Sequence, residues 1–226
     1  MSNTPLSNQQ ILSHVDHTLL KPTASWEDIV ALCDEAVKHQ VASVCVPPSY
    51  VWRINQQYGS ALTVCTVVGF PLGYSVTSAK LAEVQQAISD GATEIDMVIN
   101  ISDAKNGGFG KITDEISALK RACGNNILKV IIETCYLTDA EKIKICGCVT
   151  EAKADFIKTS TGFGTAGATM EDILLFKQHI GKDVKIKAAG GIRTREDMVA
   201  FIEAGCERLG TSAAIKILGG EESTGY

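Results

Sequence analysis

The sequence predicts an α/β protein and, within that class, a single closed (β/α)8 barrel. Short β-branched runs alternate with segments of helical spacing from residue 14 almost to the end of the chain. The runs show little polar alternation, which is typical of parallel strands covered on both faces. The 226 residues contain no linker and no break in composition. These observations favour one closed barrel over two domains, with an open doubly wound sheet as the alternative.

Eight runs are expected to form the strands of this barrel. They are residues 14–20, 42–46, 62–68, 94–99, 128–133, 155–160, 184–189 and 208–212. The helices are expected between and after them, at residues 25–40, 78–90, 110–123, 138–153, 169–180, 194–204 and 213–218. The order is that of a TIM barrel, in which each strand is followed by a helix.

The expected helix ends carry local signals. Hydroxyl residues that can cap a first turn stand at Ser25, Ser78, Thr138, Thr169 and Thr194. The segments "TDAE" and "TRED" match the capping box, in which two side chains satisfy free N–H groups of the first turn. Glycines follow four of the helices, at Gly91, Gly124, Gly181 and Gly205. Each expected helix except the last, at residues 213–218, therefore has a start or a stop of its own.

The domain prediction covers the whole chain, 1–226, with a short N-terminal extension (1–13) and a flexible polar tail (219–226). The net charge of −5 argues against nucleic acid as a partner. No apolar run of 18 residues and no signal-peptide pattern is present, so a cytoplasmic protein without a membrane partner is expected. Eight cysteines without a C-x-x-C pair are expected to be reduced.

Four charged residues interrupt the apolar runs, namely Asp16, Asp96, Lys158 and Lys187. Asp96, Lys158 and Lys187 are each expected near the carboxyl end of the strand, where barrels carry their sites. Strands six and seven are neighbours, so the two lysines are expected to lie close, and their repulsion is predicted to lower the pKa of at least one. A neutral lysine attacks carbonyl groups and forms a Schiff base. Asp96 is then expected to pair with the charged lysine and relay protons.

Two points stay open at this stage. The spacing does not say which lysine is the nucleophile. The alternative to a Schiff-base site is a structural ion network, in which Asp96 only neutralises a lysine. Glu133 fits either interpretation. Asp16 is expected either to be structural or to give secondary polar support to the site. The four histidines are too scattered to predict a metal site.

The loops after the last two strands predict a phosphate site. Gly190 and Gly191 precede one capped helix, and Gly210 and Ser212 precede another. Barrels bind phosphate with these loops, through backbone N–H groups and a helix N-terminus. Arg193 adds a positive charge nearby.

A second glycine pattern offers a different interpretation. Gly162, Gly164 and Gly167 have the G-x-G-x-x-G spacing of a dinucleotide fingerprint. However, the next strand ends in lysine and alanine, where a ribose-binding acid is expected. Gly162 is therefore better explained by close approach of a substrate phosphate or of the imine.

Four segments carry a resemblance to a known family. "HVDHTLL", "EIDMVINI", "DFIKTSTGF" and "VKIKAAGGIR" resemble deoxyribose-phosphate aldolases, in order and from about residue 14 to the end. The resemblance implies a barrel that is a class I aldolase, without metal or cofactor. It implies reversible cleavage of 2-deoxy-D-ribose 5-phosphate to acetaldehyde and D-glyceraldehyde 3-phosphate, a reaction of deoxyribonucleotide catabolism. Its partners would be this sugar phosphate and aldehydes, and its assembly a homodimer.

The resemblance also implies roles for individual residues. Lys158 forms the Schiff base, Lys187 perturbs its pKa and holds the relay, Asp96 relays protons, and Tyr226 helps to protonate the enamine. The phosphate contacts map onto Gly162, Gly190, Gly191, Arg193, Gly210 and Ser212. Cys45 resembles a position near the pocket that reacts with aldehydes. Phe163 departs from relatives that have lysine there, which predicts greater dependence on backbone N–H groups. A non-catalytic barrel that binds a sugar phosphate is the remaining alternative.

Overall fold

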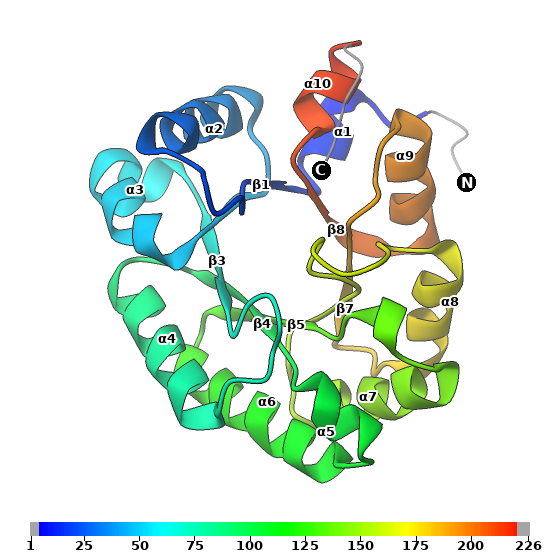
Figure 1. The fold of residues 1–226 in the computed structure, drawn as a ribbon. Helices are drawn as coiled ribbons and strands as arrows, with labels where there is room; N and C mark the ends of the chain where they lie inside the picture. Colours follow the sequence, from blue (N-terminus) through cyan, green and yellow to red (C-terminus); the bar gives the residue numbers. More distant parts are fainter. Residues whose placement is uncertain (1–4, 221–226) are drawn as a thin grey trace.

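A closed ring of eight parallel strands forms the centre of the computed structural model, which describes residues 5–220 (Figure 1). The strands follow one another in chain order, and β1 pairs with β8 to close the ring. Their bounds are β1 (Val15–Thr18), β2 (Ser43–Val46), β3 (Val64–Val68), β4 (Glu94–Val98), β5 (Ile127–Ile131), β6 (Phe156–Lys158), β7 (Lys185–Ala189) and β8 (Cys206–Thr211). The predicted (β/α)8 barrel is confirmed, and the open doubly wound sheet is wrong.

Helices surround the ring on its outer side (Figure 1). The longer ones are α2 (Trp26–His39), α3 (Val51–Tyr58), α4 (Thr77–Ser89), α6 (Phe109–Cys123), α7 (Asp139–Glu151), α8 (Met170–His179) and α9 (Arg195–Ala204). Shorter helices and turns are α1 (Asn8–Leu12), η1 (Pro48–Tyr50), η2 (Gly59–Ala61), α5 (Ile101–Lys105), η3 (Thr134–Tyr136) and α10 (Ala214–Leu218). Each strand is thus followed by at least one helix.

Most predicted helix starts agree with the structure, and one is wrong. The hydroxyls of Thr138 and Thr194 accept from the backbone of the third helical residue, and both capping boxes form. Ser78, in contrast, lies inside the first turn of α4, because this helix begins at Thr77 and has Val76 as its N-cap without a side-chain bond. Helix α3 was not predicted, since Val51 and Ile54 are its only buried residues and give a short signal.

The segment predicted as an N-terminal extension contributes to the core in part. Helix α1 is capped by Ser7, and its Ile11 and Leu12 are buried. In Figure 1 this helix lies beside α10, with which it is in contact. Ile11 and Leu12 belong to the main core, while Asn8 Nδ2 of the same helix donates to the carbonyl of Leu218 in α10.

The interior of the barrel has two different walls. Leu20, Cys45, Cys65 and Val67, from β1 to β3 and the loop after β1, form an apolar cluster. Charged side chains point inward from β1, at Asp16, and from β4 to β8. Alternation along each strand decides which side chains point into the barrel. In β4, Ile95 and Met97 belong to the main core, while Asp96 between them points inward and bonds to Lys158. The charged wall positions the candidate site.

Candidate active site

Seven charged side chains meet inside the barrel, and we call them the interior ion cluster. They are Asp16, Glu94, Asp96, Lys129, Lys158, Lys187 and Arg208. All but Arg208 are almost completely buried, and its side chain is 17% exposed. Buried charges need partners, because an unpaired one costs several kcal/mol. The pairing within the cluster therefore decides its geometry.

Asp96 is the centre of the cluster. Its Oδ2 accepts from the Nζ atoms of Lys158 and Lys187, each at 2.7 Å. The two lysines are register partners on β6 and β7, so the predicted proximity is present. Burial raises the pKa of Asp96, but Lys129, Lys158 and Lys187 together hold it well below its usual value. Asp96 is thus a carboxylate shared by lysines.

Two cations of the cluster were missed by the sequence reasoning. Lys129 Nζ lies 2.9 Å from Asp96 Oδ1 and 2.7 Å from Glu94 Oε2. Arg208 donates to both oxygens of Glu94 at 2.9 Å, and to Asp16 Oδ1 at 2.6 Å. Lys129 carries the same signal as Lys158, a lysine within an apolar run. Arg208 is the first residue of the predicted strand 208–212, and a charged residue at the end of a strand does not by itself indicate a site.

The structure corrects the predicted depth of two residues. Lys158 is the last residue of β6, but Asp96 and Lys187 lie in the middle of β4 and β7. The reason is that barrel strands tilt and stagger, so residues at one level of the barrel lie at different positions along their strands.

The carboxylates beside Lys187, and not the neighbouring lysine, dominate its pKa. Burial lowers this pKa, but the carboxylates of Asp16 and Asp96 outweigh burial and raise it above its usual value. The sequence did not decide between a structural and a supporting role for Asp16. In the structure, Asp16 Oδ2 accepts a hydrogen bond from Lys187 Nζ, so Asp16 is a direct partner of this lysine. Two carboxylates hold Lys187 as an ammonium.

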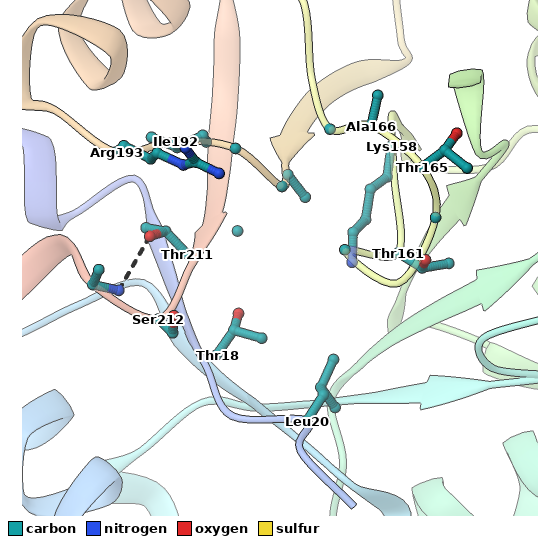
Figure 2. A pocket seen from close by; sticks show the side chains of 18 residues that line it. Thr18, Leu20, Lys158, Thr161, Thr165, Ala166, Ile192, Arg193, Thr211 and Ser212 are labelled. Carbon is teal, nitrogen blue, oxygen red and sulfur yellow. Dashed lines mark hydrogen bonds between the residues drawn. The ribbon is translucent and has the colours of Figure 1, made fainter. Parts of the chain in front are cut away.

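A cavity of about 260 Å³ opens above the cluster (Figure 2). Lys158 lines it, together with Thr18 and Leu20 from the first strand and its loop. All the predicted phosphate residues line it as well, namely Gly162, Gly190, Gly191, Arg193, Gly210 and Ser212. In Figure 2, Lys158 lies on one side and Arg193 and Ser212 lie on the other. The cavity thus combines an amine with a glycine-rich, basic wall.

The glycines of the G-x-G-x-x-G pattern have a packing role. A Cβ on Gly167 would lie 2.3 Å from the carbonyl of Gly190, so the loops after β6 and β7 touch backbone to backbone. Gly190 and Gly191 also have φ angles of 79° and 74°, which favour glycine. This contact accounts for Gly167 without a dinucleotide, and nothing in the site favours that alternative.

Cys45 does not lie where an aldehyde in the cavity would meet it. It is completely buried in the apolar wall of the barrel, beside Cys65, its register partner on β3. Cys65 and Asp96 have ligand atoms near that of Cys45, as a metal site would require. However, the ammonium of Lys129 already lies 3.1 Å from Cys65 Sγ and 2.9 Å from Asp96 Oδ1. Tyr226, the remaining predicted residue, lies outside the described residues.

Fold and site together define a class of protein: a barrel enzyme whose cavity presents a lysine amine paired with a buried carboxylate. Comparison with known proteins places the chain within that class. Residues 10–215 match the model of the DeoC/LacD family aldolases. The chain belongs to this family of carbon–carbon lyases.

Individual relatives agree over nearly the whole chain. The sequence is 63% identical to a deoxyribose-phosphate aldolase of Clostridium botulinum (strain Alaska E43 / Type E3), covering 98% of this chain and 100% of that protein. It is 58% identical to a deoxyribose-phosphate aldolase of Clostridioides difficile (strain 630), covering 96% of this chain and 100% of that protein. The tetrameric deoxyribose phosphate aldolase of Aeropyrum pernix superposes with a TM-score of 0.88 at 31% identity, covering 94% of this chain and 91% of that one.

None of the helices that the structure describes has both the length and the apolar character needed to cross a bilayer.

Proposed function

We propose that the protein is a class I aldolase that reversibly cleaves 2-deoxy-D-ribose 5-phosphate to acetaldehyde and D-glyceraldehyde 3-phosphate. One observation carries the proposal. Lys158 is the one lysine among the described residues that line the cavity, and the opposite wall combines glycine loops with Arg193 and Ser212. An aldehyde at the amine and a phosphate at the glycine loops fit the two ends of one sugar phosphate. The named relatives support this substrate.

Lys158 is the nucleophile in this mechanism. The uncharged amine adds to the C1 aldehyde of the sugar and loses water, which leaves an iminium. Asp96 lies beside this amine, and its carboxylate is shared with Lys129 and Lys187.

The remaining steps follow from the iminium, which acts as an electron sink. Removal of the C3 hydroxyl proton breaks the C2–C3 bond, releases glyceraldehyde 3-phosphate and leaves an enamine on Lys158. Protonation at C2 and hydrolysis then release acetaldehyde. Asp96 remains beside the nitrogen and stabilises its positive charge. Lys187, held as an ammonium by two carboxylates, keeps Asp96 oriented.

Borohydride trapping tests the proposal. Incubation of the protein with acetaldehyde and borohydride is expected to add one ethyl group, on Lys158, which peptide mass spectrometry will locate. The same label is expected with the sugar phosphate as substrate. Chelator in the assay is expected to leave both reactions unchanged. A protein that binds the sugar phosphate without forming the adduct would instead be the non-catalytic barrel.

The anion site is expected to control substrate choice. The change Ser212→Asp places a carboxylate in the glycine-rich wall. It is expected to raise KM for the phosphorylated sugar at least tenfold, because like charges about 4 Å apart near a protein surface repel by a few kcal/mol. KM for unphosphorylated 2-deoxyribose is expected to change little. Ser78→Asp, an equal charge on the exposed start of α4, is the control. Equal effects on both sugars would contradict the assignment.

Several finer points remain predictions. The half-exposed Phe163 forms an edge-to-face contact with Phe70, with ring centroids 5.4 Å apart. Because Phe163 carries no charge, we propose that phosphate binding depends on backbone N–H groups. A homodimer and the role of Tyr226 are proposed on the resemblance alone. A cytoplasmic location and a single domain over the whole chain are proposed on the sequence patterns described above.

A further inference from the structure

Two free cysteines lie side by side in the apolar wall of the barrel. Cys45 on β2 and Cys65 on β3 are register partners in the parallel sheet. Both belong to the apolar cluster with Leu20 and Val67, so their side chains point to the same face of the sheet. Neighbouring strands lie about 4.8 Å apart, a Cα separation that a disulfide spans. The two sulfur atoms lie within 4.8 Å of each other, so small movements bring them into bonding distance.

This pair results from the register of the sheet and not from spacing along the chain. Cys146 and Cys148 are much closer in sequence, but residues two apart on a helix such as α7 do not face each other. Cys135 is partly exposed, whereas the other seven cysteines are buried. The Cys45–Cys65 pair is therefore the one that strand pairing itself holds face to face.

The two thiols differ in how readily they ionise, and the thiolate is the form that an oxidant attacks. The sulfur of Cys65 lowers the pKa of the Cys45 thiol, and the charges of Lys187 and Lys158 act in the same direction, while burial opposes them. Burial holds the pKa of Cys65 well above its usual value. Cys45 is thus suited to react first, and Cys65 to react with the product.

A small oxidant has a short route to the pair. Leu20 packs in the cluster with both cysteines and also lines the cavity, where Figure 2 shows it. It is 7% exposed, while both cysteines are completely buried. The sulfur atoms therefore lie one side chain behind the cavity wall. Hydrogen peroxide is close to water in size, so movement of this leucine is enough to admit it.

Oxidation of the pair would reach the site through Cys65. Its Sγ donates to Asp96 Oδ1 at 3.1 Å and accepts from Lys129 Nζ at 3.1 Å. A bridge to Cys45 removes the S–H proton and draws the sulfur away from both groups. Asp96 is the carboxylate bonded to the cavity amine of Lys158. The bridge therefore deprives this carboxylate of one hydrogen bond.

We propose that Cys45 and Cys65 are an oxidation site at which hydrogen peroxide forms a reversible disulfide inside the barrel and lowers activity. The Cys45 thiolate attacks one peroxide oxygen and the O–O bond breaks. Hydroxide leaves, takes up the proton that Cys45 released, and becomes water. The sulfur of Cys65 then attacks the sulfenic acid on Cys45, and the hydroxyl group leaves with the Cys65 proton as a second water. Two thiols are oxidised and one peroxide is reduced. Dithiothreitol reopens the bridge by thiol–disulfide exchange.

Peptide mass spectrometry of the whole protein tests the proposal. After peroxide treatment, free thiols are alkylated in denaturant and the chain is digested with trypsin. Cleavage after lysine and arginine puts the two cysteines into peptides 39–53 and 54–80, each with a single cysteine. We expect these peptides to be joined, with the loss of two hydrogens. Sugar phosphate cleavage is expected to fall at least about tenfold, since a hydrogen bond to a charged group contributes roughly that factor. Dithiothreitol is expected to reverse both changes.

Three variants provide the controls, each compared with its own untreated activity. Cys45→Ala removes the first thiol and is expected to form no bridge and to resist peroxide. Cys65→Ser keeps a donor for Asp96 and is expected to resist it as well. Cys135→Ser removes the partly exposed thiol and is expected to stay as sensitive as the wild type.

Two results would overturn the proposal. One is a wild type whose two peptides stay separate after peroxide, including one in which Cys45 carries a sulfinic acid instead. The other is a Cys45→Ala variant that peroxide inactivates as fast as the wild type. Because the bridge is detected by mass, its formation is tested independently of the proposed aldolase function.

Discussion

Replacing Lys158 by methionine is expected to lower the rate of sugar phosphate cleavage by at least about 10⁴-fold, because enzymes accelerate reactions by roughly 10⁶-fold or more and the covalent route begins at this amine. Lys187 is not expected to take over. It is completely buried, and its Nζ is bonded to Asp16 and Asp96. Steady-state measurement of glyceraldehyde 3-phosphate formation gives the rate, and borohydride trapping is expected to find no adduct.

The methionine variant is expected to fold normally. Methionine has an unbranched side chain that adapts to its surroundings, and Asp96 keeps Lys129 and Lys187 as partners. The matched control is Lys182→Met, which removes an exposed lysine after α8 and is expected to leave the rate unchanged. A Lys158→Met variant with the thermal stability of the wild type and more than about 1% of its activity would exclude Lys158 as the nucleophile.

The change Asp96→Asn is expected to have the largest effect on stability. Removing one member of a buried ion pair typically costs 3–5 kcal/mol, since the partner charge is left buried without compensation. Here three lysines lose their shared carboxylate. The free energy of unfolding in urea at pH 7 is expected to fall by roughly that amount, and activity by more than about 10²-fold. Asp183→Asn, an exposed carboxylate near the start of β7, is the control and should change neither.

The same variant gives a test at acidic pH. The folded-state pKa values of Asp16 and Asp96 are lowered, since their lysine and arginine partners outweigh the effect of burial. The stability that they contribute is therefore complete above about pH 4, the unfolded-state value, and is lost as the pH falls towards their folded-state pKa values. The wild type is expected to lose up to about 1.4 kcal/mol per pH unit for each such group in this range. In Asp96→Asn this decline should be shallower; parallel declines would contradict the assignment.

Much of this site could be predicted because strand alternation is local. Alternation in "EIDMV" puts Asp96 on the opposite face from Ile95 and Met97, and adjacency of consecutive strands puts Lys158 beside Lys187. The loops after β7 and β8 could be predicted as a phosphate site because parallel strands all end at the same edge of the barrel. Lys129 in "LKVIIE" carries the same signal as Lys158, a lysine within an apolar run, so local alternation indicates it equally well.

The depth of a residue inside the barrel was not predictable in this way. Depth depends on tilt and stagger, which are properties of the whole closed sheet. Asp96 and Lys187 were therefore expected too close to the strand ends. The raised pKa of Lys187 has the same origin, because its partner Asp16 is 171 residues away in the sequence and reaches it only when β1 closes on β8.

The sequence by itself determined eight strands, their order, the inward side of each and the loops that line the cavity, because these follow from short-range periodicity and from turn chemistry. The tertiary structure alone decided which lysine lines the cavity, which carboxylate neutralises the other, and that Glu133 bonds to Thr161. These are contacts between distant segments, and their geometry is set by closure of the barrel.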